Sequence, residues 1–150
     1  MLLTTLLMIN VKTLFTLAVV FLLLVGCITR FRTKNNTPPL LAPAYTTVGV
    51  QEFQNLITDP DVNIQLLDVR SRDEYDDGHI GVAQLIDVND EDFVDRALAV
   101  LDMQRPVAVY CRSGRRSARA ARLLVDKGFK VTNLDGGVMA WLDAGKSLVK

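Results

Sequence analysis

The residues best suited to chemistry in this sequence lie in one short run that begins at Cys111. A cysteine thiolate is a strong nucleophile, and neighbouring arginines favour the thiolate over the neutral thiol. Gly114 allows the backbone to curve so that several amides point at one anion. The run therefore predicts a nucleophilic Cys111 at the head of an anion-binding loop. The substrate contacts are expected from Arg112, Ser113, Gly114, Arg115, Arg116 and Ser117.

Two elements must position this loop. The apolar run Val107-Ala108-Val109-Tyr110 directly before Cys111 predicts a buried strand, and residues 113–127 carry apolar side chains at helical spacing. Ligands of open α/β sheets bind at the carboxyl ends of the strands. Because a helix N-terminus presents free amides and a positive dipole end, Cys111 is expected to ionise more readily than a free thiol.

The rest of the chain after residue 43 alternates between strand-like and helical patterns. Strands are expected at 64–69, 84–88, 106–110 and 130–134, and helices at 50–58, 91–101, 113–127 and 138–142. Asp90 is expected to cap the second helix, Gly128 to end the third, and Gly136-Gly137 to turn into the last. The alternation predicts an α/β fold in three layers, with a mostly parallel central sheet and helices on both faces.

Composition excludes several classes of protein. The chain has 150 residues, about one domain, and equal numbers of basic and acidic residues, 17 each. A net charge of zero gives no reason to expect nucleic acid as a partner. Two cysteines far apart do not form a disulfide framework, and no His, Cys, Asp or Glu cluster has metal-ligand spacing. Neither a metal nor another cofactor is expected.

The N-terminal segment resembles an export signal. The apolar run from Leu14 to Val25 has the length of a signal-peptide core, and translation starts at either Met1 or Met8. The run ends in Leu24-Val25-Gly26-Cys27, which resembles the lipobox of bacterial lipoproteins, with Cys27 as the lipidated residue. We therefore expect a signal peptide at 1–26, a linker at 27–43 and the folded domain at 44–150. The domain would be attached to a membrane and face the periplasm or the cell exterior.

An uncleaved membrane anchor is the alternative for this segment. Arg30, Arg32 and Lys34 follow the apolar run. Under the positive-inside rule these charges would keep the domain in the cytoplasm. Both interpretations place the domain at a membrane surface, through either a lipid or the anchor.

The loop and its surroundings resemble the rhodanese family of sulfurtransferases. The block from Val109 to Ser117 is similar to the single-domain rhodanese loop C-R-x-G-x-R-[ST]. The resemblance extends over about Tyr45 to Val149. Further matches are Leu67-Asp68-Val69-Arg70 with Glu74, Gly78-His79-Ile80, and Leu134-Asp135-Gly136-Gly137 followed by Trp141 and Gly145.

This resemblance implies a rhodanese-like fold and a persulfide on Cys111, held by the loop from Arg112 to Arg116. Sulfur would pass from thiosulfate or a similar anionic donor to a thiol or cyanide, with a protein as a further acceptor class. Asp68, Arg70, Glu74 and His79 would be structural. Related cysteine phosphatases and arsenate reductases have a wider loop, C-x5-R, whereas Cys111 and Arg116 are separated by four residues. The shorter loop favours sulfur transfer.

The sequence leaves alternatives to these assignments open. His79 is the only histidine, so a Cys/His dyad stays open beside the structural interpretation. A persulfide carrier or protein-binding module without turnover is a second functional class, and a phosphatase or arsenate reductase is a third. Gly81-Val82-Ala83 departs from the Pro-Gly-Ala usual in the family. Trp141 is interpreted as a core residue of the last helix.

Overall fold

The computed structural model describes residues 45–150. The predicted signal peptide, the predicted lipidation site Cys27 and the linker lie outside these residues, so they remain predictions. Within residues 45–150, no helix combines the length and the apolar character needed to cross a membrane.

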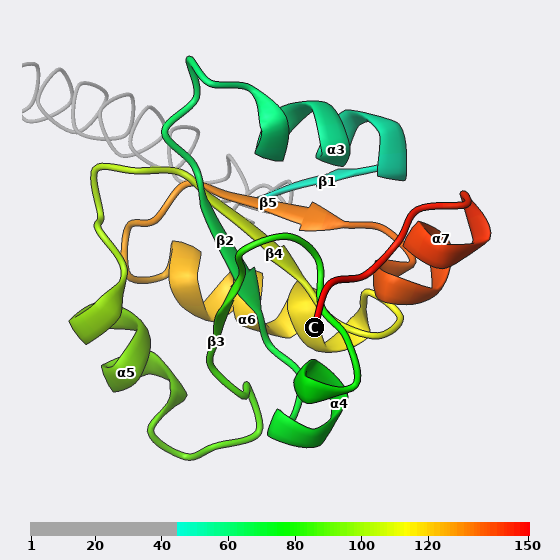
Figure 1. The fold of residues 1–150 in the computed structure, drawn as a ribbon. Helices are drawn as coiled ribbons and strands as arrows, with labels where there is room; N and C mark the ends of the chain where they lie inside the picture. The colour runs from blue at the N-terminus through cyan, green and yellow to red at the C-terminus, as the bar shows by residue number, and fades with distance from the viewer. Residues whose placement is uncertain (1–44) are drawn as a thin grey trace, which may run out of the picture. The chain divides into compact units, whose positions relative to one another are not determined.

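A five-stranded sheet forms the centre of the domain (Figure 1). Every pair of neighbouring strands is parallel, which confirms the predicted parallel sheet. The strands lie in the order β1-β5-β4-β2-β3, so the strand that leads to Cys111 is central. Their bounds are β1 Thr46–Val48, β2 Gln65–Asp68, β3 Gln84–Leu85, β4 Val107–Tyr110 and β5 Val131–Leu134.

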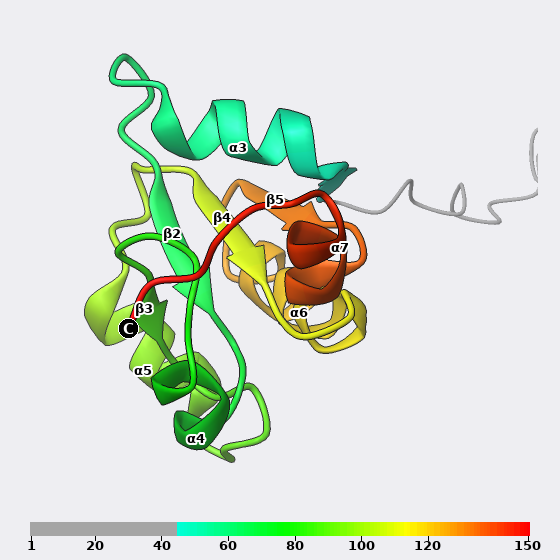
Figure 2. The same ribbon diagram turned by 45° about the vertical axis from the view of Figure 1, so that its right-hand side comes forward.

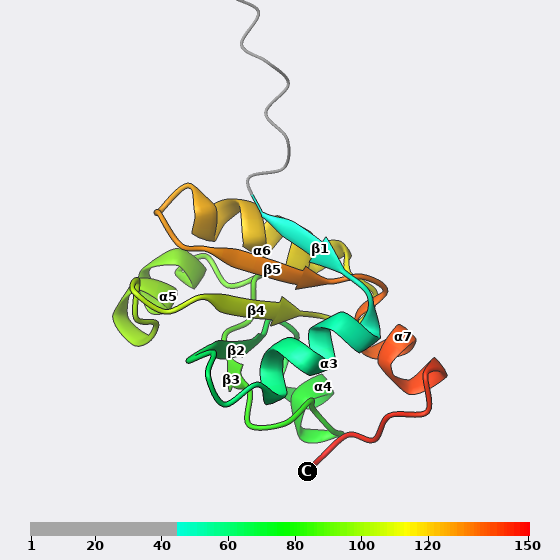
Figure 3. The ribbon, with the colours of Figure 1, turned by 90° about the horizontal axis from the view of Figure 1, so that it is seen from above.

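Helices cover both faces of this sheet, as Figure 3 shows from above. Those packed on one face are α5 and α6, and those on the other are α3 and α7. The helices are α3 Val50–Thr58, α4 Arg72–Asp76, α5 Phe93–Val100, α6 Arg115–Val125 and α7 Gly137–Asp143. The three-layer α/β architecture expected from the alternating pattern is therefore confirmed.

Strand β4 is buried on both sides because its side chains alternate between two cores. Val107 and Val109 pack with α5 and α6, whereas Ala108 and Tyr110 pack with α3 and α7. All four residues are fully buried. Trp141 belongs to the second core and donates its indole N–H to the Ser147 carbonyl, in agreement with the core role predicted for it. The end of β4 is thereby a rigid support for Cys111.

Two short elements were not predicted. Strand β1 has three residues and only one buried side chain, Val48, so it carries no readable periodicity. Helix α4 has five residues and none is buried. A capping box starts α4: the Ser71 hydroxyl accepts from the Glu74 amide, and the Glu74 carboxylate accepts from the Ser71 amide. Local capping, and not an apolar stripe, defines this helix.

Of the residues predicted to bound helices, the one at the start of α5 differs from the prediction and the one at the end of α6 agrees with it. Helix α5 begins at Phe93 after Asp92, without a side-chain cap, so the prediction that Asp90 is the N-cap is wrong. Asp90 instead pairs with Arg96 at 2.7 Å, an exposed ion pair. Gly128 has the predicted left-handed conformation at the end of α6, with φ of 96°.

Candidate functional site

Cys111 directly follows β4 and begins the turn into α6. Figure 2 shows this turn between the end of β4 and the start of α6. Its side chain is almost fully buried, with 1% exposed. The sulfur accepts two hydrogen bonds, from the Gly114 amide at 3.2 Å and from the Ser117 hydroxyl at 3.4 Å. The turn therefore curls around the sulfur and points donors at it.

These donors change the acidity of the thiol. Burial raises the pKa of Cys111, because it disfavours the charged form. The Ser117 hydroxyl and the backbone amides of Ser117, Ser113 and Gly114 act in the opposite direction and together outweigh burial. The net result is a pKa below the ordinary value of a thiol. A larger fraction of Cys111 is therefore ionised at a given pH than of an ordinary thiol.

The shape of the turn depends on Gly114, the residue before α6. Gly114 has φ of 86°, in the left-handed region. A β-carbon at this position would lie 3.2 Å from the Gly136 amide nitrogen, so a side chain would be both strained and crowded. Because α6 has no side-chain cap, its first amides stay free to face an anion.

Helix α7 holds the opposite side of the same turn. The Val138 amide donates to the Cys111 carbonyl at 2.8 Å, and the Met139 amide donates to the Arg112 carbonyl at 3.0 Å. Bonded this way, the carbonyl groups point away from the sulfur and the amides of the turn point toward it. The close contact requires Gly137, where a β-carbon would lie 2.2 Å from the Cys111 oxygen.

Sequence reasoning assigned Gly136-Gly137 only to a turn. Their role as the support of the Cys111 turn was missed, since it depends on a contact between residues far apart in the chain. The available signal was the pair of glycines directly before a helix that follows a buried strand. Such glycines allow close approach of two backbones.

The guanidinium group of Arg116 is paired with a carboxylate. Its guanidinium forms two hydrogen bonds with the Glu74 carboxylate, at 2.6 and 2.7 Å. The bond from Arg116 is the largest cause that lowers the pKa of Glu74 to about 2, and the Ser71 amide acts in the same direction. Burial opposes them. Glu74, interpreted as structural from the sequence, therefore links α4 to the loop and partly offsets the charge of Arg116.

A second ion pair supports the fold below the site. Asp68 and Arg70 are in contact at 2.6 Å with side chains 0% and 5% exposed, and Arg70 also donates to the Gly78 carbonyl at 2.8 Å. Burial lowers the pKa of Arg70, but the hydrogen bond that it donates to Asp68 leads the interactions that raise this pKa above its ordinary value. A buried pair of this kind holds the end of β2 in place.

Among residues 45–150, the hydrogen bonds to the Cys111 sulfur come from Gly114 and Ser117 and not from His79. Its ring stacks on Tyr75 with centroids 3.8 Å apart, and its backbone pairs with Val149. The contacts of His79 within this part of the chain are thus with Tyr75 and Val149. Nearby, Gly81 takes φ of 53° and Val82 is 97% exposed, so the unusual Gly-Val-Ala segment forms an exposed turn.

An arginine-lined hollow opens beside the Cys111 turn. It measures about 350 Å³ and is lined by Ser113, Arg115, Arg116 and Arg119. Arg115 and Arg112, on either side of the turn, make no ion pair within residues 45–150. Uncompensated guanidinium groups near free amides suit an oxyanion.

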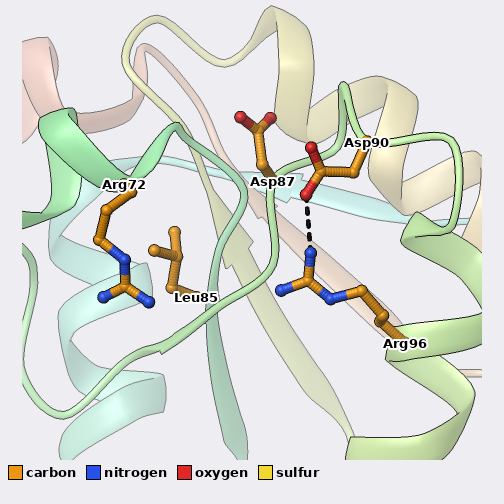
Figure 4. Close-up of a pocket in the computed structure, with 5 residues that line it drawn as sticks. All are labelled: Arg72, Leu85, Asp87, Asp90 and Arg96. Atoms are coloured by element: carbon orange, nitrogen blue, oxygen red, sulfur yellow. Dashed lines mark hydrogen bonds and ion pairs between the residues drawn. The ribbon is translucent and has the colours of Figure 1, made fainter.

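A separate hollow of about 260 Å³ lies past the end of β3 (Figure 4). Arg72 and Arg96 flank it, together with Asp87 and Asp90. Here the charges are balanced, and Arg96 is already paired with Asp90. This hollow is therefore a weaker anion site than the one beside Cys111. Within the described part of the chain, no cluster of three or more His, Cys, Asp or Glu residues is arranged to hold a metal ion.

The known proteins that this chain resembles are rhodanese-like domains and sulfurtransferases. Residues 49–144 match the model of the rhodanese-like domain. Thiosulfate sulfurtransferase 18 of Arabidopsis thaliana is 34% identical over 91 residues, which cover 53% of this chain and 67% of that protein. Thiosulfate sulfurtransferase GlpE of Shewanella oneidensis is 38% identical over 84 residues, which cover 55% and 79%. The solution structure of a rhodanese-like domain from Anabaena superposes with a TM-score of 0.61 at 32% identity, covering 69% of this chain and 77% of that one.

Proposed function

The chain belongs to the rhodanese-like domain family, and on this basis we propose that it is a sulfurtransferase that works through a persulfide on Cys111. The observation that carries the proposal is the Cys111 sulfur itself. It is buried at a strand end, accepts bonds from Gly114 and Ser117, and has a lowered thiol pKa. A thiolate in such a turn is ready to attack without a separate base.

The first step is uptake of sulfur. The Cys111 thiolate attacks the outer sulfur of thiosulfate or a similar donor, the sulfur–sulfur bond of the donor breaks, and sulfite leaves with the bonding electron pair. Arg112 and Arg115 attract the anionic donor, and the amides of the turn hold the negative charge of the new persulfide. A thiol or cyanide then removes the outer sulfur and restores the thiolate.

Mass measurement of the full-length chain tests this proposal. After incubation with thiosulfate, the protein is expected to gain one sulfur atom, and Cys111→Ser is expected to gain none. Cys27→Ala is the matched control, because it removes the other cysteine and should leave the gain unchanged. Equal gain in Cys111→Ser, or no gain with any sulfur donor, contradicts the proposal. Turnover of an aryl phosphate or arsenate would favour the alternative enzyme classes.

We also propose that the chain is a lipoprotein attached through Cys27. This proposal depends on the sequence alone, since Cys27 lies outside the described residues. Metabolic labelling with palmitate is expected to mark the protein and to disappear in Cys27→Ala. Protection of the domain from protease in spheroplasts would instead place it in the cytoplasm and support the uncleaved anchor.

A further inference from the structure

The outer face of α6 carries arginines that the domain itself does not neutralise. Arg115, Arg119 and Arg122 follow one another at helical spacing of four and three residues, so they lie on one side of the helix. All three, here called the α6 arginines, are exposed, and the opposite side of α6 is buried against the sheet. Arg119 donates to the Val88 carbonyl and the Asn89 side chain, which carry no charge. Arg112 precedes the α6 arginines in the Cys111 turn. Within residues 45–150 none of the four makes an ion pair.

The other side of the Cys111 turn carries two exposed apolar side chains. Met139 and Leu142 on α7 are 50% and 49% exposed. Together with Val138 and Leu148 they line the apolar part of a hollow of about 400 Å³. Charged side chains border the rest of this hollow: Arg70, Arg112, Glu74 and Asp77. We call Met139 and Leu142 the α7 patch. It lies next to the site, because the Met139 amide bonds to the Arg112 carbonyl.

We propose that the acceptor of the sulfur is a protein whose reactive cysteine is surrounded by acidic residues and stands beside an exposed apolar side chain. This inference rests on the proposed function. The apolar side chain would pack on the α7 patch, and the acidic residues would face the α6 arginines. An apolar contact next to a charged rim is the usual composition of a protein interface, and opposite charges guide the two surfaces together.

The transfer itself balances without another reactant. The acceptor thiolate attacks the outer sulfur of the Cys111 persulfide, forming a new sulfur–sulfur bond. The bond between that sulfur and Cys111 breaks, and its electron pair remains on Cys111 as the thiolate. The acceptor leaves as a persulfide. Because Cys111 is 1% exposed, the acceptor thiol must approach closely, which a docked surface favours.

An anionic membrane surface is the alternative partner that the α6 arginines could bind. The position of the α7 patch favours a protein. The α7 patch and the α6 arginines lie on the two sides of the turn that holds Cys111. A membrane that engaged both would cover the sulfur and block its reaction with an acceptor. An acceptor protein, in contrast, has to cover the sulfur in order to react with it.

Peptide acceptors provide the test. The full-length chain is first loaded with thiosulfate, and discharge of Cys111 is then followed by mass in the presence of peptides of equal length. Each peptide has a single cysteine beside a leucine and is otherwise rich in glutamate, in lysine or in serine. At about 20 mM ionic strength the glutamate peptide is expected to discharge Cys111 about tenfold faster than the lysine peptide. The difference should shrink in high salt.

Substitutions outside the site locate the effect. Arg122→Glu is expected to slow discharge to the glutamate peptide about threefold at low salt, while discharge to cyanide stays unchanged. Lys130→Glu is the matched control with the same charge change, since Lys130 precedes β5 at the opposite end of the sheet. Leu142→Ser is expected to slow discharge to all the leucine-containing peptides and not to cyanide.

The outcomes separate the two proposals. If Cys111 does not load with sulfur, the proposed function fails and this inference fails with it. If loading is normal but the glutamate and lysine peptides react equally fast at low salt, only this inference is overturned. Binding to phosphatidylglycerol vesicles that Arg122→Glu weakens, together with equal peptide rates, would assign the α6 arginines to a membrane.

Discussion

Helices α6 and α7 begin in the same way, but the hydrogen-bond donors at their N-termini have different partners. Each follows a glycine in the left-handed conformation, Gly114 with φ of 86° and Gly136 with φ of 67°, and neither has a side-chain cap. The α6 end directs its donors at the Cys111 sulfur. The α7 end donates instead to the carbonyls of Cys111 and Arg112.

The difference shows how one anion site is assembled from two helix ends. A helix N-terminus without a cap has free amides that need partners. At α7 those partners are the loop carbonyls, so the loop is fixed. At α6 the partner is the sulfur, so the thiolate is stabilised. Positioning and electrostatic stabilisation are therefore carried by separate helices, and each can be disturbed by itself.

Breaking the α7 support is expected to have the largest effect. In Gly137→Ala the new methyl group would collide with the Cys111 carbonyl, 2.2 Å away, in a residue with φ of 58°. We expect a loss of about 3 kcal/mol or more in the free energy of unfolding, and loss of sulfur uptake. Urea unfolding and mass measurement after thiosulfate treatment check this.

Gly145→Ala is the matched control for that substitution. Gly145 also has a left-handed backbone, with φ of 72°, but no atom lies within 4 Å of its added β-carbon. It should lose only about 1 kcal/mol from backbone strain and should take up sulfur normally. Similar losses in the two variants would mean that the contact with Cys111 has no special role.

Weakening the α6 side is expected to change reactivity more than stability. Ser117→Ala removes the hydroxyl that donates to the Cys111 sulfur, so the thiol pKa should rise. Alkylation by iodoacetamide at neutral pH is expected to slow about tenfold, and the gap to the native protein should close at high pH. Ser113→Ala is the control, because only the amide of Ser113 acts on the sulfur. Equal slowing in both variants would contradict the assignment.

The smallest effect is expected from the link between α4 and the loop. Glu74 has a pKa lowered from 4.5 to about 2, so its stabilising contribution is complete above pH 4.5 and is lost as the pH falls toward 2. The pair is partly exposed, with side chains 27% and 30% accessible. We therefore expect Glu74→Gln to cost less than about 1 kcal/mol at pH 6.

Urea unfolding of the native protein and of Glu74→Gln over this pH range measures the contribution. The two unfolding free energies should converge as the pH falls below 4.5. A constant difference down to pH 2.5, or one that grows in acid, would show that the Arg116 pair does not depend on the charge of Glu74.

Local patterns in the sequence were sufficient to predict much of this domain. The apolar run of β4 and the helical spacing of α6 placed Cys111 between a buried strand and a helix. Both signals are local in the sequence, and so are the residue types of the loop. The short elements β1 and α4 lacked an apolar pattern and were missed, because pairing with β5 and a capping box define them.

The sequence by itself determined that Cys111 lies in a glycine-containing, arginine-rich turn before a helix. The tertiary structure decided which groups act on that turn. Gly137 and α7 support it from a segment beyond the next strand, and Glu74 reaches Arg116 from α4 across 42 positions of sequence. Contacts of this kind depend on how helices pack over the sheet, and no periodicity along the chain records them.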